Sequence, residues 1–519
     1  MTTSISNVSA QQQRPALANG ATDTAGDRKP SARAKLVRTL ASRFIIVMLC
    51  LAIVLSTLAY GTVHYWSLAI FQAGAAGILI LWAVDAWRSR TLRLSRNALQ
   101  LPLIGLMLVG LVQLLPFGAA PVPGADALSL PAVSSISLDP YSTRLALVQL
   151  FALFIYFAAA LAFIDSPRRL RLLVRTITIF GFLLAILGLI QAFTSPTKVY
   201  WLKELPQSTP FGPFINRHHF AGYMEMTLAL PLGLLVSGAV ERDRRPLYIF
   251  AVALMGIALV MTASRGAMIS LVAQAGFLLA VTGFRRAGDA EGSEEKKQGR
   301  ARRALVRAGL ALALVVALFA GVVLLGGEDA LSRFVGTVNS DDPTTGRTQY
   351  WSVTLDIIRE HPFIGAGLGA YGLAYTRHDT RNGFFRLEQA HNDYLQILSD
   401  AGIIGGLLGL CFIIFLFRMA LARRETTDTF RRGVVTGALA GCFAVLVHSF
   451  FDFTLHTTSN ALLFLITAAL ATLNGRVERP EHQDARRRRR RHRRAPSGAH
   501  PTEAAATSAV ARRAGGVAG

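Results

Sequence analysis

Apolar segments separated by short polar connections recur along most of the chain. Each segment holds on the order of 20 mostly apolar residues, which is enough for a helix to cross the hydrocarbon core of a membrane. The predicted spans are residues 44–61, 67–86, 98–115, 145–164, 173–193, 220–239, 246–263, 267–284, 305–326, 402–420, 433–450 and 460–475. The pattern therefore predicts an all-α polytopic integral membrane protein with about twelve transmembrane helices.

One polar segment, residues 327–401, is much longer than the connections between the other spans. A connection of that length without structure of its own is uncommon in a compact protein, so we expect it to be partly helical and functional. Within it, Arg347–Glu360 has the period of an amphipathic helix, because Trp351, Leu355 and Ile358 recur on one face.

The second half of this segment predicts a turn and then another helix. The run Gly365–Gly372 contains the G-x-G-x-x-G spacing, but no strand–helix–strand pattern surrounds it. We therefore interpret the run as a tight turn and not as a dinucleotide site. The next helix is predicted to start near Glu388, which places His391 and Tyr394 on one face, and Gly402 is predicted to begin the following span.

Composition and charge narrow the class of protein. Hydrophobic residues make up 52% of the 519 residues, charged residues make up 16%, and the mean hydropathy is +0.41, which is typical of a membrane protein and not of a soluble enzyme. The net charge is +23, and the Lys and Arg residues cluster in every second connection between spans and in both tails. No face combines basic and aromatic residues, so the charge does not indicate nucleic-acid binding. The connections 62–66 and 451–459 contain no Lys and no Arg. We therefore predict cytoplasmic termini and a loop 327–401 on the outer side of the membrane.

The same patterns divide the chain into four parts. Residues 1–42 lack apolar periodicity and predict a disordered cytoplasmic tail, and the basic, Ala-rich end predicts another. The three cysteines lie inside apolar runs, so we predict neither a disulfide framework nor a metal site. The predicted parts are the tail 1–42, the N-terminal transmembrane helices 43–209, a second membrane part 210–475 with its loop 327–401, and the tail 476–519.

Three arginines are candidates for binding an anion. Arg265 interrupts two apolar runs with a very short turn, at a depth where a cation is costly unless it is paired or functional. Arg347 stands at the start of a predicted helix, where the helix dipole gains nothing from a cation. Arg217 also falls on the predicted outer side, so the three guanidinium groups are expected to converge on one phosphate group. Snorkelling of Arg265 and a plain surface position for Arg347 are the alternatives.

His391 is the candidate catalytic residue. Imidazole is the side chain best suited to take a proton from a hydroxyl near neutral pH, and Glu388, Asn392 and Asp393 surround this one in the sequence. A buried histidine with satisfied hydrogen bonds is the alternative. The pair Asp341–Asp342 is interpreted as a turn and helix cap, so no metal and no cofactor is predicted.

In several motifs the chain resembles the O-antigen ligase family, which shares a domain with O-antigen and exopolysaccharide polymerases. The resemblance covers roughly residues 210–475, and the order of its elements matches as well as the motifs themselves. In the stretch Phe214–Phe220 the family usually has Asn in place of one of the two histidines, His218 and His219. The matching motifs are Thr262–Gly266, Gly346–Trp351, His361–Gly369, Ala390–Gln396 and Gly402–Gly405.

The resemblance implies transfer of a glycan from undecaprenyl pyrophosphate to an acceptor hydroxyl, at the periplasmic face of a bacterial inner membrane and without a metal. For a ligase the acceptor is lipid A-core, and for a polymerase it is another lipid-linked repeat. Arg217, Arg265 and Arg347 would neutralise the pyrophosphate, and His391 would activate the acceptor. The residues expected to support the acceptor are Asn392, Tyr394 and Glu388.

Two other classes of function stay open. A transporter with this number of spans would carry ionisable groups near the middle of the membrane. Here Asp85 lies near an inner end of a span, and Glu225 and Asp452 lie toward outer ends, which favours an enzyme at the membrane surface. A scaffold for polysaccharide assembly without catalysis is the third hypothesis.

Overall fold

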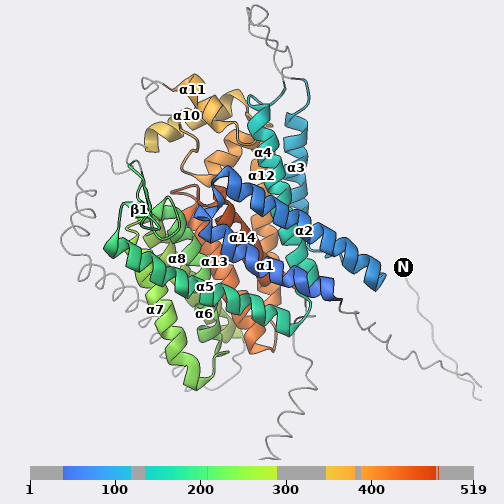
Figure 1. Ribbon diagram of the computed structural model, residues 1–519, viewed down its shortest axis with the longest axis vertical. Helices are drawn as coiled ribbons and strands as arrows, with labels where there is room; N and C mark the ends of the chain where they lie inside the picture. Colours follow the sequence, from blue (N-terminus) through green and yellow to red (C-terminus); the bar gives the residue numbers. More distant parts are fainter. Residues whose placement is uncertain are drawn as a thin grey trace, which may run out of the picture. The chain divides into compact units, whose positions relative to one another are not determined.

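The computed structural model describes residues 39–117, 135–206, 208–288, 347–379, 387–474 and 477, and these residues are mostly helical (Figure 1). The helices are α1 (Leu40–Leu58), α2 (Tyr65–Ser89), α3 (Gln100–Gln113), α4 (Pro140–Phe163), α5 (Pro167–Thr194), α6 (Arg217–Ser237), α7 (Arg245–Met261), α8 (Arg265–Gly288), α10 (Arg347–Glu360), α11 (Tyr371–His378), α12 (Asp393–Arg423), α13 (Thr429–His448) and α14 (Thr458–Thr472). Short 3-10 turns lie at Tyr60–Thr62, Arg242–Arg244 and Thr454–His456. One antiparallel hairpin joins β1 (Lys198–Val199) to β2 (Lys203–Glu204).

The helices agree with the predicted class of fold. Among the described residues, nine helices are long and apolar enough to cross a membrane, and α3 and α14 are shorter apolar helices. Together they correspond to eleven of the twelve predicted spans. The remaining predicted span, residues 305–326, lies outside the described residues, so the total of twelve and the periplasmic position of loop 327–401 stay predictions.

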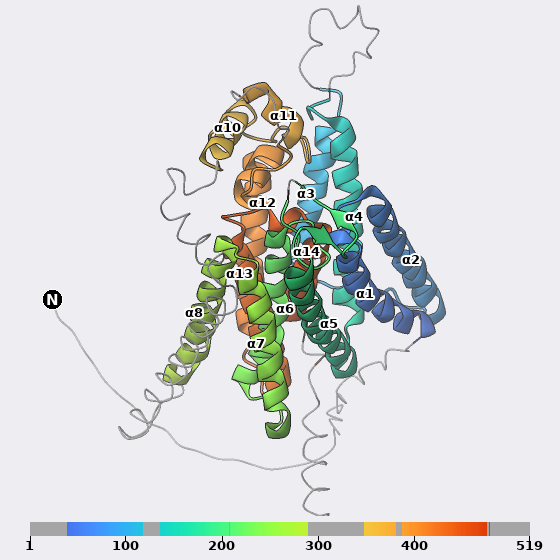
Figure 2. The same cartoon turned by 60° about the vertical axis from the view of Figure 1, so that its left-hand side comes forward.

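Helices α6 and α13 form an antiparallel pair in the core of the helix bundle. Both are largely buried, and glycines four residues apart on α13 let the two backbones approach closely. A Cβ atom added to Gly437 would lie 2.4 Å from the carbonyl oxygen of Ala229. Helix α8 packs on α13 and α7 packs on α6, as Figure 2 shows. The close pairing sets the start of α6 beside the end of α13.

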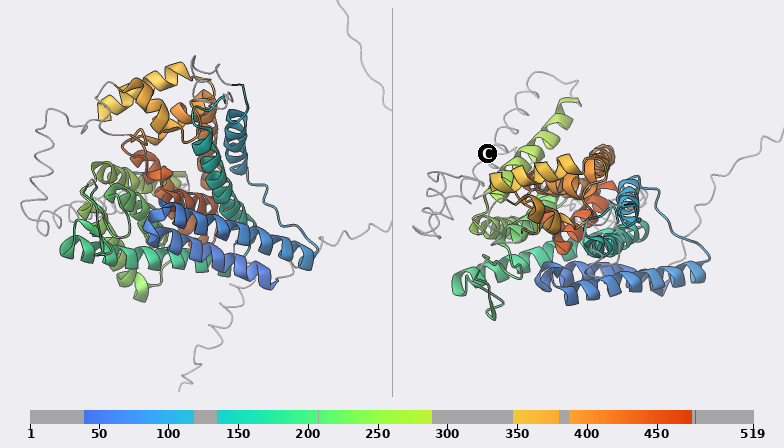
Figure 3. Two further views of the ribbon diagram at one scale, coloured as in Figure 1. Left: turned by 45° about the horizontal axis from the view of Figure 1, so that its top comes forward. Right: turned by 90° about the horizontal axis from the view of Figure 1, so that it is seen from above.

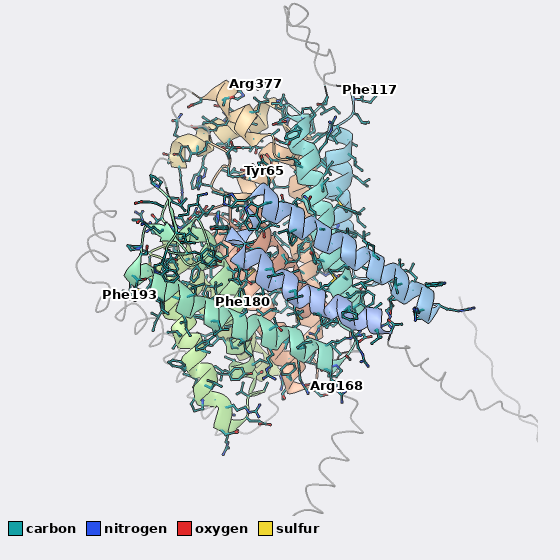
Figure 4. The ribbon with its side chains drawn as sticks, in the orientation of Figure 1. Tyr65, Phe117, Arg168, Phe180, Phe193 and Arg377 are labelled. Carbon is teal, nitrogen blue, oxygen red and sulfur yellow. The ribbon has the colours of Figure 1, made fainter. Side chains whose placement is uncertain are left out.

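Helices α1, α2 and α5 line one side of this core, in one row when seen from above (Figure 3). Contacts between α1 and both of the other two helices hold the row together. Helix α5 has the charged Arg168 at one end and Phe193, whose side chain is exposed, at the other (Figure 4). A charged end and an aromatic end are typical of a helix that crosses a membrane.

Helices α10 and α11 make a second, smaller hydrophobic cluster with the residues that precede α12. The bounds of α10 are those predicted, and α10 contacts both α11 and α12. The glycine-rich connection between α10 and α11 makes a tight turn, because Gly365, Gly367 and Gly369 all have positive φ. A Cβ atom at Gly365 would lie 2.4 Å from the backbone of Asp400. The predicted tight turn is thus confirmed, and it also brings the backbone close to that of Asp400.

Candidate functional site

A cavity of about 320 Å³ lies where the first turns of α6, α8 and α10 meet the end of α13. That volume falls at the lower end of the usual range for small-molecule sites. Its lining residues are Arg217, His218, Ala263, Ser264, Arg265, Gly266, Ile269, Arg347, Trp351, His448, Phe451 and Asp452.

The three arginines predicted to bind pyrophosphate all line this cavity. Arg217 is the first residue of α6, Arg265 is the first of α8, and Arg347 is the first of α10. The backbone N–H groups of a helix N-terminus already carry partial positive charge, so a cation is unfavourable there unless an anion accompanies it. The structure therefore combines three helix N-termini and three guanidinium groups around one space. Their role in binding pyrophosphate stays a prediction.

The turn between α7 and α8 explains how two of these arginines meet. Ala263 has φ +49° and turns the chain sharply, and the buried Ser264 follows it. The Ser264 hydroxyl lies 2.7 Å from Nδ1 of His218, the second residue of α6. This contact fixes the start of α8 against the start of α6, which places Arg265 beside Arg217.

Asp452 is a central residue of the site that the sequence did not identify. Its carboxylate is 1% exposed, and Oδ2 lies 3.3 Å from Nη2 of Arg347 while Oδ1 lies 3.4 Å from Nδ1 of His391. His218 Nδ1 is 3.9 Å from the same carboxylate. Asp452 is the one acidic residue of connection 451–459, and this is the feature of the sequence that could have indicated its place in the site.

The electrostatic environment keeps Asp452 ionised. Burial alone would raise the pKa of its carboxyl, but the contact from His391 and electrostatic interactions with two further histidines more than offset burial. They hold that pKa well below its ordinary value. The negative charge of Asp452 is therefore a permanent part of the site near neutral pH.

His391 contacts Oδ1 of Asp452, whereas Arg347 contacts Oδ2, and His391 is not among the residues that line the cavity. The prediction that a helix near Glu388 includes His391 is wrong. The side chain of Asn392 accepts hydrogen bonds from the backbone N–H groups of Tyr394 and Leu395, so α12 begins only at Asp393. His391 precedes this cap with φ +51°, a left-handed conformation that costs a non-glycine residue on the order of 1 kcal/mol.

Hydrogen bonds join the His391 segment to the segment that carries Asp452. The Asp393 N–H donates to the carbonyl of Ser449 at 2.9 Å, and the Asn392 amide donates to the carbonyl of Phe450 at 3.1 Å. The His391 ring packs edge-on against Phe453, with 4.7 Å between centroids. Asn392 thus helps to hold His391 beside Asp452.

Tyr394 and Glu388, the other two residues predicted to support the acceptor, do not lie beside His391 and Asp452. The hydroxyl of Tyr394 donates to the carbonyl of Leu446 at 2.7 Å, and its ring packs on Phe450. Tyr394 therefore faces α13 and shares no helical face with His391. Glu388 is exposed and does not line the cavity.

Trp351, one turn after Arg347 on α10, is one of two aromatic residues in the described lining, with Phe451. Its indole N–H donates to the carbonyl of Ala390 at 3.2 Å, which connects the cavity wall to the residue before His391. Among the residues that the structure describes, no group of three or more His, Cys, Asp or Glu side chains is arranged to hold a metal ion. The pair Asp341–Asp342 lies outside them.

Comparison with known families identifies this region of the chain. The profile described as O-antigen ligase matches residues 250–410. Residues 250–410 therefore resemble the O-antigen ligase domain. The family predicted from the sequence is thereby confirmed over this range, and the match indicates a membrane enzyme of the ligase or polymerase type. The O-antigen ligase domain includes Arg265, Arg347 and His391, whereas Arg217 and Asp452 lie outside the matched range. A comparison with curated proteins gives no match.

Proposed function

We propose that this protein transfers a glycan from undecaprenyl pyrophosphate to an acceptor hydroxyl at the periplasmic face of a bacterial inner membrane. The preferred reaction is ligation of O-antigen to lipid A-core, and polymerisation of lipid-linked repeats is the alternative. The observation that carries the proposal is the cavity with its three arginines at helix N-termini. Of the described residues that line it, three are guanidinium cations and one is a carboxylate, so the cavity favours an anionic ligand.

The arginines are suited to a departing diphosphate. A guanidinium group stays charged and binds phosphate oxygens through two parallel N–H donors. Negative charge builds up on the diphosphate as its bond to the anomeric carbon breaks, and fixed donors aimed at that charge usually contribute much of the catalysis.

The cavity also has an apolar wall that fits a lipid-linked donor. Ile269 on α8 lines the cavity and is 47% exposed, and Val272, one turn further along α8, is 55% exposed. Exposed apolar side chains on a membrane-spanning helix face lipid. A polyprenyl chain lying along this face of α8 would place its diphosphate at Arg265, the first residue of the helix.

His391 and Asp452 complete the proposed chemistry. With its Nδ1 proton directed at the Asp452 carboxylate, His391 leaves Nε2 to accept the proton of the acceptor hydroxyl. The acceptor oxygen then bonds to the anomeric carbon, and the electron pair of the broken carbon–oxygen bond leaves with the diphosphate. Because Asp452 contacts both His391 and Arg347, one carboxylate positions the base and the anion site relative to each other.

A transfer assay with purified protein tests the proposal. Lipid-linked donor is incubated with lipid A-core or with a second lipid-linked repeat as acceptor, and the products are separated by mass. Glycan attached to lipid A-core supports the ligase, and a lengthened lipid-linked glycan supports the polymerase. Failure to consume donor with either acceptor, by protein that is correctly folded, would contradict the proposal.

A further inference from the structure

A second buried pair of titratable residues, Glu225 and His448, adjoins the cavity, and the chemistry proposed above does not use it. Nδ1 of His448 on α13 lies 2.9 Å from Oε1 of Glu225 on α6, and neither side chain has any exposed surface. The Ser270 hydroxyl donates to the same carboxylate oxygen at 2.5 Å. The Gln274 amide donates to the backbone carbonyl of Glu225 at 3.1 Å. Three helices therefore fix the position of this carboxylate.

The position of the pair determines its protonation. A buried carboxylate is costly unless a cation or a proton accompanies it. The favourable forms are thus an imidazolium facing a carboxylate, or a protonated Glu225 that donates to Nδ1 of a neutral His448. In both forms Nε2 of His448 carries a hydrogen atom and is a donor.

That donor is directed toward the cavity. His448 lines the cavity, and its Nε2 is buried without a hydrogen-bond partner among the described residues. Next to it, also in the cavity wall, is Gly266, where a Cβ atom would lie 3.1 Å from Nε2 and 2.8 Å from Cδ2 of the ring. Glycine at this position places no side chain against this edge of the imidazole, although Nε2 itself is buried. A buried N–H group without a partner is uncommon, and an acceptor atom of a bound ligand would satisfy it.

We propose that His448, kept in a donor form by Glu225, is a fourth donor to the diphosphate of the bound lipid, beside the three arginines. The proposal rests on the proposed function, because it requires a diphosphate in this cavity. The Glu225–His448 pair is neutral as a whole, so it contributes a directed hydrogen bond without adding to the positive charge of the cavity.

Binding of farnesyl diphosphate tests the proposal, since this probe carries an isoprenoid diphosphate but no sugar. Affinity is measured for the full-length protein in detergent. Glu225→Gln is compared with the double variant Glu225→Gln/His448→Phe, because neither variant leaves a lone charge in the membrane interior. Both variants are expected to bind the probe about tenfold more weakly than wild type, the loss that accompanies removal of one hydrogen bond to a charged group. Glu225→Gln no longer keeps His448 in its donor form, and the double variant removes the donor itself. Thr282→Val is the matched control and is expected to bind within about twofold of wild type, since its hydroxyl donates to Leu278 within α8 and Thr282 does not line the cavity.

Gly266→Ala tests the same donor while both members of the pair are kept. The added methyl group would lie 2.8 Å from Cδ2 and 3.1 Å from Nε2 of His448, so the ring must shift, and binding is again expected to weaken. Wild-type affinity in both Glu225→Gln variants, with binding still lost in Arg265→Ala, would overturn the role of His448 and leave the proposed function intact. Unchanged affinity in Gly266→Ala would likewise overturn it. Absence of probe binding by wild type would overturn both proposals.

Discussion

Two groups of charged side chains in this protein differ in how their charges balance. Around the start of α5, Arg93 lies 3.0 Å from Asp85 and 3.0 Å from Asp165, and Arg169 lies 3.2 Å from Asp165. These four side chains are at most 10% exposed, and two cations balance two carboxylates. At the cavity, by contrast, Asp452 is the one carboxylate among the described lining residues, which include three arginines.

The same types of residue therefore have different roles in the two places. In the cluster of Arg93 and Arg169, every cation has a carboxylate within ion-pair distance, and the group joins α2 to the connection between α4 and α5. Such a closed network fixes the packing of helices and offers nothing to a ligand. The described part of the cavity wall has three arginines to one carboxylate and borders space for a ligand. We therefore interpret the first group as structural and predict that the second binds an anion.

The strongest test of the contrast removes a cavity arginine. We expect Arg265→Ala or Arg347→Ala to lower kcat/KM by about a thousandfold, because each guanidinium group faces charge that develops on the diphosphate. Arg347→Ala should also lower stability, because it removes a cation from the buried Asp452. Lys at either position should rescue only part of the activity. A transfer assay and a thermal melt measure both effects.

Arg359→Ala is the matched control for Arg347→Ala. Arg359 lies in the last turn of α10, pairs with Asp356 and is 74% exposed. We expect its removal to leave activity within about twofold of wild type, as for an exposed ion pair. Full activity in both Arg265→Ala and Arg347→Ala would show that the cavity does not hold the reacting anion.

Arg93→Ala is the corresponding change in the closed network. It leaves Asp85 and Asp165 buried without this cation, so we expect the free energy of unfolding to fall by about 3 kcal/mol. The specific activity of the protein that remains folded should be normal. Chemical unfolding in detergent, together with the transfer assay, checks this. Lost activity at unchanged stability would contradict the comparison.

His391→Ala should lower kcat by about a hundredfold and leave affinity for the donor nearly unchanged, because a general base acts on the acceptor. His391→Gln keeps a hydrogen-bonding side chain but cannot accept the proton, so it should lose about as much activity as His391→Ala. Near-native activity in His391→Gln would mean that His391 only positions the acceptor. A collapse of donor affinity would place it with the arginines instead.

Asp452→Asn should lower kcat by about tenfold, because the amide cannot stabilise a positively charged His391. The pKa of the Asp452 carboxyl is lower in the folded protein than in the unfolded chain. Its contribution to stability is therefore present above a pH of about 4 and is lost only as the pH falls toward the lowered pKa. The difference in stability between wild type and Asp452→Asn should then be constant between about pH 5 and pH 8. A difference that disappears at pH 5 would contradict this.

The smallest effect is expected at His456, whose Nδ1 lies 2.7 Å from Asp393. Burial alone would lower the pKa of His456, but its hydrogen bond and electrostatic interaction with Asp393 raise it above the ordinary value. The stability from this pair is present below a pH of about 6.5 and is lost as the pH rises through the raised pKa. His456→Gln should therefore cost more stability at pH 6 than at pH 9, which thermal melts at the two values can measure. An equal loss at both would exclude a charged pair.

Local pattern predicts much of this fold, because the features concerned depend on neighbours in the sequence. Apolar runs locate the helices that could span a membrane, and the spacing of Trp351, Leu355 and Ile358 predicts α10 with its observed bounds. The high cost of an arginine between two apolar runs identifies Arg265. Asn392 shows where local reasoning was insufficient, since its capping hydrogen bonds determined the start of α12 and excluded His391 from the helix.

The relations between distant segments are what the sequence could not show. Asp452 becomes part of the site because hydrogen bonds from Asn392 and Asp393 join its segment to that of His391. Glu225 meets His448 because the glycines of α13 allow α6 to pack closely. Each carboxylate, taken alone, looked like an isolated charge near the end of a span.

The central claim is that the diphosphate of a lipid-linked donor binds between Arg217, Arg265 and Arg347. Its most direct test is a cryo-electron microscopy structure of the protein in lipid nanodiscs with a phosphonate analogue of the donor that cannot react. The account predicts density for the two phosphorus groups in this cavity, within hydrogen-bonding distance of the guanidinium groups, and the polyprenyl chain along α8. Density for the analogue at another site, with the arginine cavity containing only solvent, would contradict it.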